Sequence, residues 1–364
     1  MRPALKSGLL PVWRDRDTLQ IGIDPRRAVA LSGMGHAAFV IGLLDGSRDR
    51  DQVIAAAAGR GIPVQTTERI LTLLAAGGAL DDFPASTLRE LPLALRAKLA
   101  PELATTSLAY RDGDGGARAL ARRRAAVVRI EGDRRIGRAA ARLLKAAGVG
   151  QVHFVRPPAD GATPASGGEF PDSGRPRSAA MTSGAARPIA SPGDPGSDRR
   201  SGAGRESRSG QPLRPGITPV IRPDLIVLAG RQPIERLAQL ARAPVPHLAV
   251  MAGEAIGVVG PLVVPGHTAC LLCLDYVRAG NDPAWPLILS QIVRKRPEPP
   301  ACDAVLATAV AAQAAAQALT AIEHGPLASA ATNGTLELVL PDWRWRRRTW
   351  PPHPACPCGS HTVR

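Results

Sequence analysis

The sequence predicts an α/β fold, in which a Rossmann-like, mainly parallel sheet follows a small winged-helix-like α+β module. Two observations lead to this prediction. Short strand and helix patterns alternate with turn residues over the first 82 residues, and a strand, a glycine turn, a helix and a second strand follow one another between residues 125 and 155. A chain of 364 residues with 45% hydrophobic residues can form a core in each part.

The first module, residues 1–82, is predicted to contain three strands and three helices. The runs 10–14 and 18–23 flank a polar turn and predict a β-hairpin, to which 27–31 adds a third strand. The glycines that follow each apolar run mark where a helix ends. Helices are therefore expected over 34–44, from a cap at Ser47 to Ala58, and from a cap at Thr66 or Thr67 to Ala76.

The third of these helices distinguishes two common uses of a winged helix. A helix that reads DNA needs several Arg, Lys, Asn or Gln side chains, whereas this one carries a single arginine in an otherwise apolar stripe. An apolar helix beside a sheet with an open edge is suited to hold an extended peptide as an added strand. The sequence therefore favours peptide binding, with five candidate residues: Arg27, Val29, Leu31, Arg69 and Leu73.

The formal net charge is +15, which admits nucleic acid, an anionic membrane or an acidic polypeptide as a partner. Arginine accounts for all but four of the 46 basic residues and is spread over the chain rather than gathered in one patch. Aromatic residues make up 3%, too few for a base-stacking surface. The composition argues against nucleic acid, and DNA binding through the winged helix stays as an alternative hypothesis.

The sequence shows no signal peptide at its start, and its one long uncharged run, 304–322, is mainly alanine with Gln313 and Gln317 inside it. Alanine and glutamine provide too little transfer free energy for a membrane span, so this run predicts a buried helix and no membrane partner. We expect the protein to be cytoplasmic. In that compartment a Cys-x-x-Cys motif is more often metal-binding or redox-active than disulfide-bonded.

The domain organisation follows from changes in composition. A helical connector, residues 83–123, leads to the α/β domain, residues 124–359, which precedes a tail, residues 360–364. Residues 157–216 are rich in Gly, Pro, Ser, Ala and Arg and predict a disordered insertion. Beyond it, strands are expected at 224–229, 246–251, 335–340 and 343–350, helices at 234–241 and 304–322, and a hairpin at 254–265.

The turn from Gly132 to Gly137 opens the predicted βαβ unit and departs from the GxGxxG phosphate loop. The middle glycine of that motif lets the backbone approach a pyrophosphate, and Arg134 stands in its place. The acidic residue expected after the second strand is also missing, because Val155 is followed by Arg156. The pattern keeps the architecture of a nucleotide-binding domain and argues against ATP binding.

Two cysteine pairs, about eighty residues apart, predict a metal site. Four thiolates can surround Zn²⁺ tetrahedrally and leave no position open for catalysis, so we expect a structural zinc. The second pair is spaced Cys-x-Cys, so His353 or His361 can instead replace one thiolate, and disulfides or unrelated surface thiols are competing interpretations. The candidate ligands are Cys270, Cys273, Cys356 and Cys358.

Two stretches of sequence resemble known families. Leu10-Pro-Val-Trp-Arg, Leu19-Gln-Ile-Gly-Ile-Asp-Pro and Leu44-Asp-Gly are similar to the leader-peptide recognition element of proteins that make thiazole/oxazole-modified microcins (TOMMs). From about residue 125 to 359 the order βαβ, Cys-x-x-Cys, alanine-rich helix and terminal cysteine pair resembles the ThiF/MoeB branch of ubiquitin-activating-like adenylyltransferases. The first resemblance implies binding of a ribosomal precursor peptide, and the second implies a ThiF-type fold that uses ATP and Mg²⁺.

The second resemblance also implies an acidic Mg²⁺ ligand in a pattern such as Asp-x-Thr-Asp-Asn, and this chain has Leu228-Ala-Gly-Arg-Gln there. Arg231 cannot coordinate Mg²⁺. Cys302, which precedes the alanine helix, is a weak candidate nucleophile, because nothing here is expected to make the acyl adenylate that it would attack. We therefore predict no catalytic residue beyond this weak candidate, and we expect the α/β domain to be a pseudoenzyme.

Together the resemblances imply a leader-binding component of a TOMM cyclodehydratase, which is not an enzyme by itself. It would deliver the precursor peptide to a separate YcaO-type cyclodehydratase for azoline formation, and it is a possible homodimer. The alternative hypothesis is an active adenylyltransferase that acts on a ubiquitin-like carrier.

Overall fold

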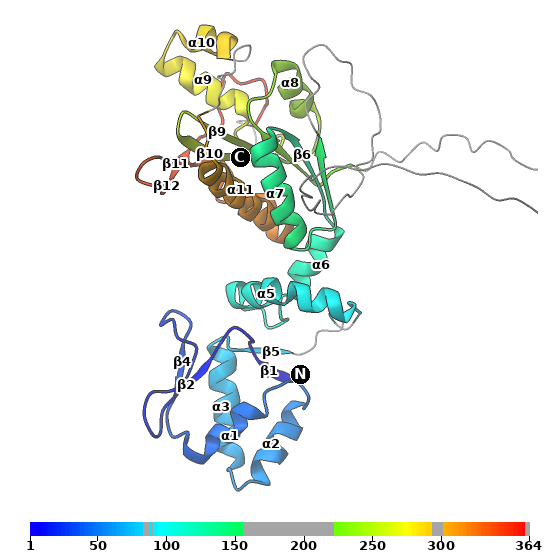
Figure 1. Cartoon of the computed structure of the whole chain (residues 1–364), viewed down its shortest axis with the longest axis vertical. Coiled ribbons are helices and arrows are strands. Elements are labelled where there is room, and N and C mark those ends of the chain that lie inside the picture. The colour runs from blue at the N-terminus through cyan, green and yellow to red at the C-terminus, as the bar shows by residue number, and fades with distance from the viewer. Residues whose placement is uncertain (83–87, 89, 156–221, 293–300, 361–364) are drawn as a thin grey trace, which may run out of the picture. The chain divides into compact units, whose positions relative to one another are not determined.

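The computed structural model describes residues 1–82, 88, 90–155, 222–292 and 301–360. The predicted insertion, 157–216, and His361 lie outside these residues. In the N-terminal module (Figure 1) the strands are β1 Pro3–Leu5, β2 Pro11–Trp13, β3 Leu19–Ile21, β4 Val29–Leu31 and β5 Leu80–Asp82. Its helices are the 3-10 turn η1 Gly35–Ala38, α1 Phe39–Gly42, α2 Arg50–Ala58 and α3 Val64–Ala76.

Two of the expected helix caps were wrong. Helix α2 begins after Asp49 rather than Ser47, because Asp49 and Gln52 form a reciprocal capping box at 2.9 and 3.0 Å. Helix α3 begins after Pro63, so that Thr67 lies inside it with its side chain fully buried. A proline at this boundary needs no N–H donor, which lets the helix start one turn earlier than predicted.

Strands β2, β3 and β4 form the predicted three-stranded antiparallel sheet, in the order β2-β3-β4. Strand β4 is therefore an edge, and the end of α3 lies beside it: a Cβ added to Gly77 would come within 2.3 Å of Val29 Cγ2. Only glycine permits this approach of the helix to the strand. The arrangement places an apolar helix next to an open sheet edge.

A second, two-stranded sheet pairs β1 with β5, about eighty residues apart, and was not predicted. Buried Lys6 follows β1 and contacts Asp81 of β5 at 2.8 Å, and its Nζ donates to Ser107 Oγ at 2.6 Å. Ser107 belongs to the connector, which consists of α5 Leu93–Tyr110 and α6 Ala117–Ala125. These contacts join the chain start to the connector.

The connector is also joined to the last helix by a buried ion pair. Arg123 Nε lies 2.5 Å from Glu323 Oε1, and the two side chains are 8% and 1% exposed. Tyr110 donates to Glu323 Oε2 at 2.6 Å, and Arg123 donates to Thr106 Oγ1 at 3.1 Å. Removing one member would leave the other charge buried without its partner, which typically costs about 3–5 kcal/mol.

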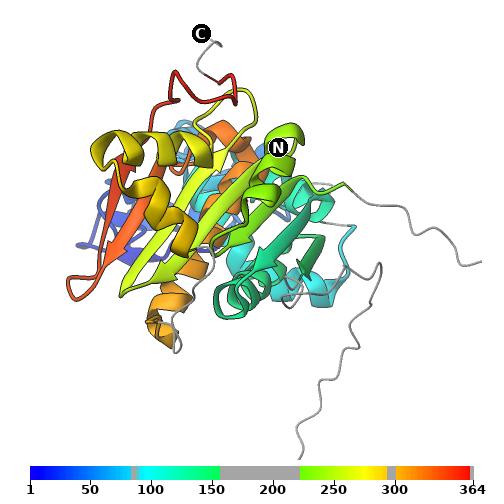
Figure 2. The ribbon, with the colours of Figure 1, turned by 90° about the horizontal axis from the view of Figure 1, so that it is seen from above.

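The α/β part contains a seven-stranded sheet in the order β12-β11-β10-β9-β8-β6-β7 (Figure 2). Its strands are β6 Val127–Gly132, β7 Gln151–Val155, β8 Leu225–Ala229, β9 His247–Gly253, β10 Ile256–Val263, β11 Gly334–Val339 and β12 Arg344–Thr349. Strands β7, β6, β8 and β9 are parallel neighbours, and the other three are added antiparallel. Five strands thus run one way, so the sheet is mainly parallel, as predicted.

Helices cover both faces of this sheet, as strand β8 shows. Leu225 and Val227 share a core with helices α7 Arg134–Ala146 and α11 Ala304–His324, whereas Ile226 and Leu228 pack with α8 Ile234–Arg242 and α9 Leu271–Asn281. The remaining helices are α10 Trp285–Ile292 and the 3-10 turn η2 Pro326–Ala328.

Helix α11 alone, within the described ranges, is long and apolar enough to cross a membrane, but half of its most apolar window is buried. It packs against α7, β9 and β10. The expectation of a buried core helix is confirmed.

Candidate functional site

The four cysteines that the sequence singled out come together at one end of the sheet. Cys270 and Cys273 lie at the start of α9, and Cys356 and Cys358 lie in the C-terminal segment after β12. All four Sγ atoms lie within 4.8 Å of one another, and the distances from Cys270 Sγ to Cys273 Sγ and Cys356 Sγ are 3.8 and 3.6 Å.

These distances fit zinc and exclude disulfides. The corners of a tetrahedral thiolate site are about 3.8 Å apart, because each Zn–S bond is about 2.3 Å long, whereas disulfide sulfurs would be about 2.05 Å apart. The four residues would hold zinc with all four positions filled, and such a metal supplies folding energy rather than a catalytic water.

The surroundings of the cluster are largely apolar and fix its loops. Trp350 is 2% exposed and packs in the same cluster, and its Nε1 donates to Thr335 Oγ1 at 2.9 Å. Asn333 Oδ1 accepts from Ala269 N at 2.8 Å, which holds the loop before the first pair. In this apolar setting burial raises the pKa of Cys356 to about 12, so this thiol requires a nearby cation to be ionised at neutral pH.

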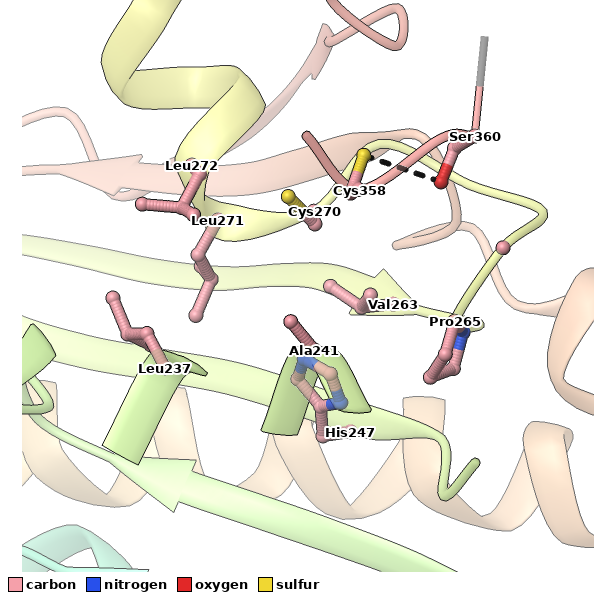
Figure 3. A pocket seen from close by; sticks show the side chains of 11 residues that line it. Leu237, Ala241, His247, Val263, Pro265, Cys270, Leu271, Leu272, Cys358 and Ser360 are labelled. Carbon is pink, nitrogen blue, oxygen red and sulfur yellow. Dashed lines mark hydrogen bonds between the residues drawn. The ribbon is translucent and has the colours of Figure 1, made fainter. Parts of the chain in front are cut away.

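Cys358 differs from the other three because it sits beside a hydroxyl (Figure 3). Burial acts to raise its pKa, but hydrogen bonding with Ser360, at an Sγ to Oγ distance of 3.4 Å, helps to bring that pKa down to about 7. A pocket beside the cluster is lined by Cys270, Cys358 and His247 (Figure 3). The Nδ1 atom of His247 lies 3.2 Å from Val245 O, within hydrogen-bond distance.

His353 does not belong to the group of thiols in the described residues. Its Nδ1 accepts from Ala355 N at 3.2 Å, and its ring stacks on Tyr276 with a centroid distance of 5.1 Å. The hypothesis that it replaces a cysteine ligand has no support in this geometry. The parallel hypothesis for His361 lies outside the described residues.

The turn from β6 into α7 joins strand and helix in the order of a nucleotide-binding βαβ unit. Gly132 has φ 109°, and a Cβ there would lie 1.9 Å from Ala229 O, so this glycine serves the close approach of two strands. A Cβ added to Gly137 would likewise lie 2.4 Å from Phe154 Cε2. Both glycines of the predicted loop are thus explained by packing.

Two backbone N–H groups in the first turn of α7 are already bound by a side chain of the protein. The Asp133 carboxylate caps the helix, accepting from Arg135 N at 2.8 Å and Ile136 N at 3.1 Å. Those N–H groups would otherwise be the phosphate-binding groups of a helix N-terminus. The sequence offered this signal, an aspartate directly before a helix, and our prediction missed it.

An ion pair occupies the carboxyl end of strand β6. Glu131 is 9% exposed and accepts from Arg236 Nε and Nη2 at 2.9 and 2.7 Å. Arg231 lies two residues after the end of β8. The resemblance to adenylyltransferases implies an acidic Mg²⁺ ligand at this position. Glu131 is thus paired with arginine side chains, and Asp133 is engaged in the helix cap.

Cys302 lies in the core that α7 and α11 share, with 7% of its surface exposed. Burial raises the pKa of its thiol above the ordinary value. Arg135 Nη1 donates to the backbone carbonyl of this residue rather than to the sulfur. A thiol in this state is a poor nucleophile.

The five candidate peptide-binding residues all lie on or beside β4 and α3. Val29 is half-buried against the helix end, and Arg69 and Leu73 are exposed and four residues apart on α3, so they share a face. Leu31 is only 2% exposed and packs in the module core, so its side chain supports the strand. The Arg27 guanidinium donates to Leu108 O of the connector.

Three solved structures share the fold of this chain. The chain is similar to the heterocyclase TruD, with a TM-score of 0.58 and 16% identity, and the match covers 99% of this chain and 43% of TruD. It is also similar to a heterocyclase in complex with substrate and cofactor, with a TM-score of 0.59 and 14% identity, and that match covers 99% of this chain and 40% of the heterocyclase. It is also similar to Escherichia coli MccB with AMPCPP and MccA (0.58, 14%), covering 99% of this chain and 100% of that one. The chain thus spans about two fifths of the heterocyclases it matches.

At these identities the likeness shows the fold, and the Rossmann-like, ThiF-type fold expected from the sequence is confirmed. No family model matches the chain, and no curated protein matches it.

Proposed function

We propose that the chain binds the leader segment of a ribosomal precursor peptide and delivers it to a separate YcaO-type cyclodehydratase, which forms the azolines. The observation that carries this proposal is the open edge of β4 beside α3. Within the described residues β4 pairs only with β3, so its outer N–H and C=O groups are available to an added strand.

The chemistry of this edge suits an extended peptide. Val29 and Leu73 offer apolar contact along it, and Arg69 adds a positive charge on the same helix face as Leu73. A bound leader would place apolar side chains at alternate positions against Val29 and Leu73, with an acidic residue near Arg69. Backbone hydrogen bonds would supply affinity, and these side chains would supply selectivity.

The α/β part would act as a scaffold without adenylating activity. Asp133 fills the place of a phosphate at α7, Arg134 replaces the glycine that a pyrophosphate needs, and Arg231 puts a cation at the expected metal edge. The zinc cluster would fasten the C-terminal segment to α9.

The comparisons support the proposal. Among the similar structures are heterocyclases, one with a substrate and a cofactor, and MccB with MccA. We infer from this likeness that the partner peptide of our chain is a biosynthetic precursor, and we propose that the two meet in the cytoplasm.

The test is reconstitution with a YcaO-type enzyme and a short Cys/Ser/Thr-rich precursor peptide, both to be sought among the neighbouring open reading frames. We expect rapid loss of one water per ring, measured by mass spectrometry, only when ATP, the enzyme and this chain are all present. Equal rates with and without this chain would refute delivery. Ring formation by this chain and ATP alone would refute its non-catalytic role.

A further inference from the structure

The last strand, β12, carries an unusual set of side chains for the edge of a large sheet. Its six residues read Arg-Trp-Arg-Arg-Arg-Thr, and all six are exposed. Figure 2 shows β12 at the outer side of the seven-stranded sheet, beyond β11. Within the described ranges β12 pairs only with β11, so every second residue presents its N–H and C=O outward.

Three of the arginines form a ladder on one face. Arg344, Arg346 and Arg348 are spaced two apart, so they point to the same side of the strand. The opposite residues on β11 are Val339, Glu337 and Thr335, and Glu337 accepts a hydrogen bond from Thr335 at 2.8 Å.

The ladder is only partly neutralised by the described part of the chain. Arg346 pairs with Asp342 at 2.8 Å but is 68% exposed, and the Arg348 guanidinium stacks over Trp350 at 4.2 Å. No ion pair or hydrogen bond of the Arg344 guanidinium occurs among the described residues. The edge therefore combines unpaired backbone groups with a row of positive charge.

Charge decides which strand can fill this edge. In an antiparallel pair, side chains directly opposite lie about 5 Å apart, and like charges there are destabilising. A second copy of β12 would set arginines against arginines, so this edge is protected from self-pairing. A strand with carboxylates at alternate positions would instead set one acid against each arginine of the ladder.

We propose that the β12 edge is a docking site for an acidic, extended segment of a partner protein, which adds to the sheet as an antiparallel strand. This site is separate from the β4 edge and does not depend on the function proposed for it. The recognition elements are the outer backbone groups of β12 and the guanidiniums of Arg344 and Arg346.

The test uses the full chain and a fluorescent heptapeptide with alternating glutamate and valine, read by anisotropy. A peptide of the same composition with its glutamates in one block is the control for bulk attraction to a protein of charge +15. We expect the alternating peptide to bind at least about tenfold more tightly, because only it can align its carboxylates with the ladder. N-methylation along one backbone edge of that peptide should abolish binding.

Two charge-reversed variants locate the site. R344E/R346E should weaken binding about tenfold or more, whereas R138E/R142E, which changes the same charge on exposed positions of α7, should weaken it less than about threefold. Equal affinity for the two peptides, or equal loss in the two variants, would overturn the proposal. So would a single-stranded oligonucleotide that binds the ladder more tightly than the alternating peptide does.

Discussion

The carboxylate of Asp133 accepts a hydrogen bond from the backbone N–H of Arg135 at 2.8 Å, and a second bond from the next residue, Ile136, completes the cap. In a nucleotide-binding βαβ unit, the N–H groups of this turn face a phosphate. Here the protein supplies its own anion. The same residue that stabilises α7 thus engages two N–H groups of the kind that face a phosphate in such a unit.

The cap can be tested by its contribution to stability. Asp133→Ala should lower the free energy of unfolding by about 1 kcal/mol, because it leaves two N–H groups at the helix start without a protein acceptor. Asp133→Asn keeps an acceptor oxygen and should lose only a fraction of that amount. Urea unfolding followed by circular dichroism measures both, and identical losses in the two variants would show that the cap is not the cause.

The unaltered chain is expected not to bind ATP with Mg²⁺. Asp133 occupies the helix start and Glu131 is engaged by Arg236 at 2.7 Å, so neither acid is free to hold the metal. Isothermal calorimetry should show no saturable heat up to millimolar ATP. A saturable heat together with ATP–pyrophosphate exchange would instead support the active adenylyltransferase.

Zinc should be present at one ion per chain, because four thiolates fill a tetrahedral site. Cys270→Ser and Cys358→Ser should each lose the metal and lower the unfolding midpoint, since metal binding energy is folding energy. Cys302→Ser, at a buried thiol outside the cluster, should keep it. Metal analysis of the purified variants provides the measurement, and full zinc content in either cluster variant would contradict the assignment.

The stability of the chain should depend on pH through His247. Burial lowers the pKa of its imidazole below the ordinary 6.5, so the unfolded state binds this proton first as the pH falls. The stabilisation is therefore present above about pH 6.5 and is lost progressively below it. Replacing His247 with Asn should flatten the pH dependence of the unfolding free energy between about pH 8 and 5.5.

Replacing exposed His36 with Asn serves as the control for the pH experiment and should leave that dependence unchanged. Parallel curves for the His247 variant and the unaltered chain would contradict the assignment.

The sequence predicted elements whose signal is local. The strand 127–132 is an apolar run bounded by glycine, and the hairpin of β2 and β3 has alternating residues around a polar turn. The four cysteines were assigned to one site because thiols in a Cys-x-x-Cys pattern are rare outside metal and redox sites. The two strand patterns needed no knowledge of the distant chain, whereas the cysteine pairs, about eighty residues apart, were joined through the chemistry that thiols share.

Features that depend on distant pairing were beyond the sequence. Strands β1 and β5 have three residues each, too few for a periodic pattern, and they pair across about eighty residues. Trp343 and Trp345 alternate with arginine, a pattern that favours packing of the tryptophans on one sheet face, yet they are 41% and 37% exposed at and just before the outer strand β12. The exposure of these side chains depends on the position of β12 in the strand order. The sequence of a single strand does not predict which strands lie beside it.

The most direct test of peptide binding at the β4 edge is the affinity of the full chain for the fluorescent leader segment of the neighbouring precursor peptide. Leu73→Glu should weaken binding about tenfold, because it puts a charge in the apolar contact beside β4. Leu10→Glu introduces the same charge at an exposed leucine next to β2, on the opposite edge of that sheet, and should bind as the unaltered chain does. Absence of binding by the unaltered chain, or equal weakening by both variants, would contradict the proposal.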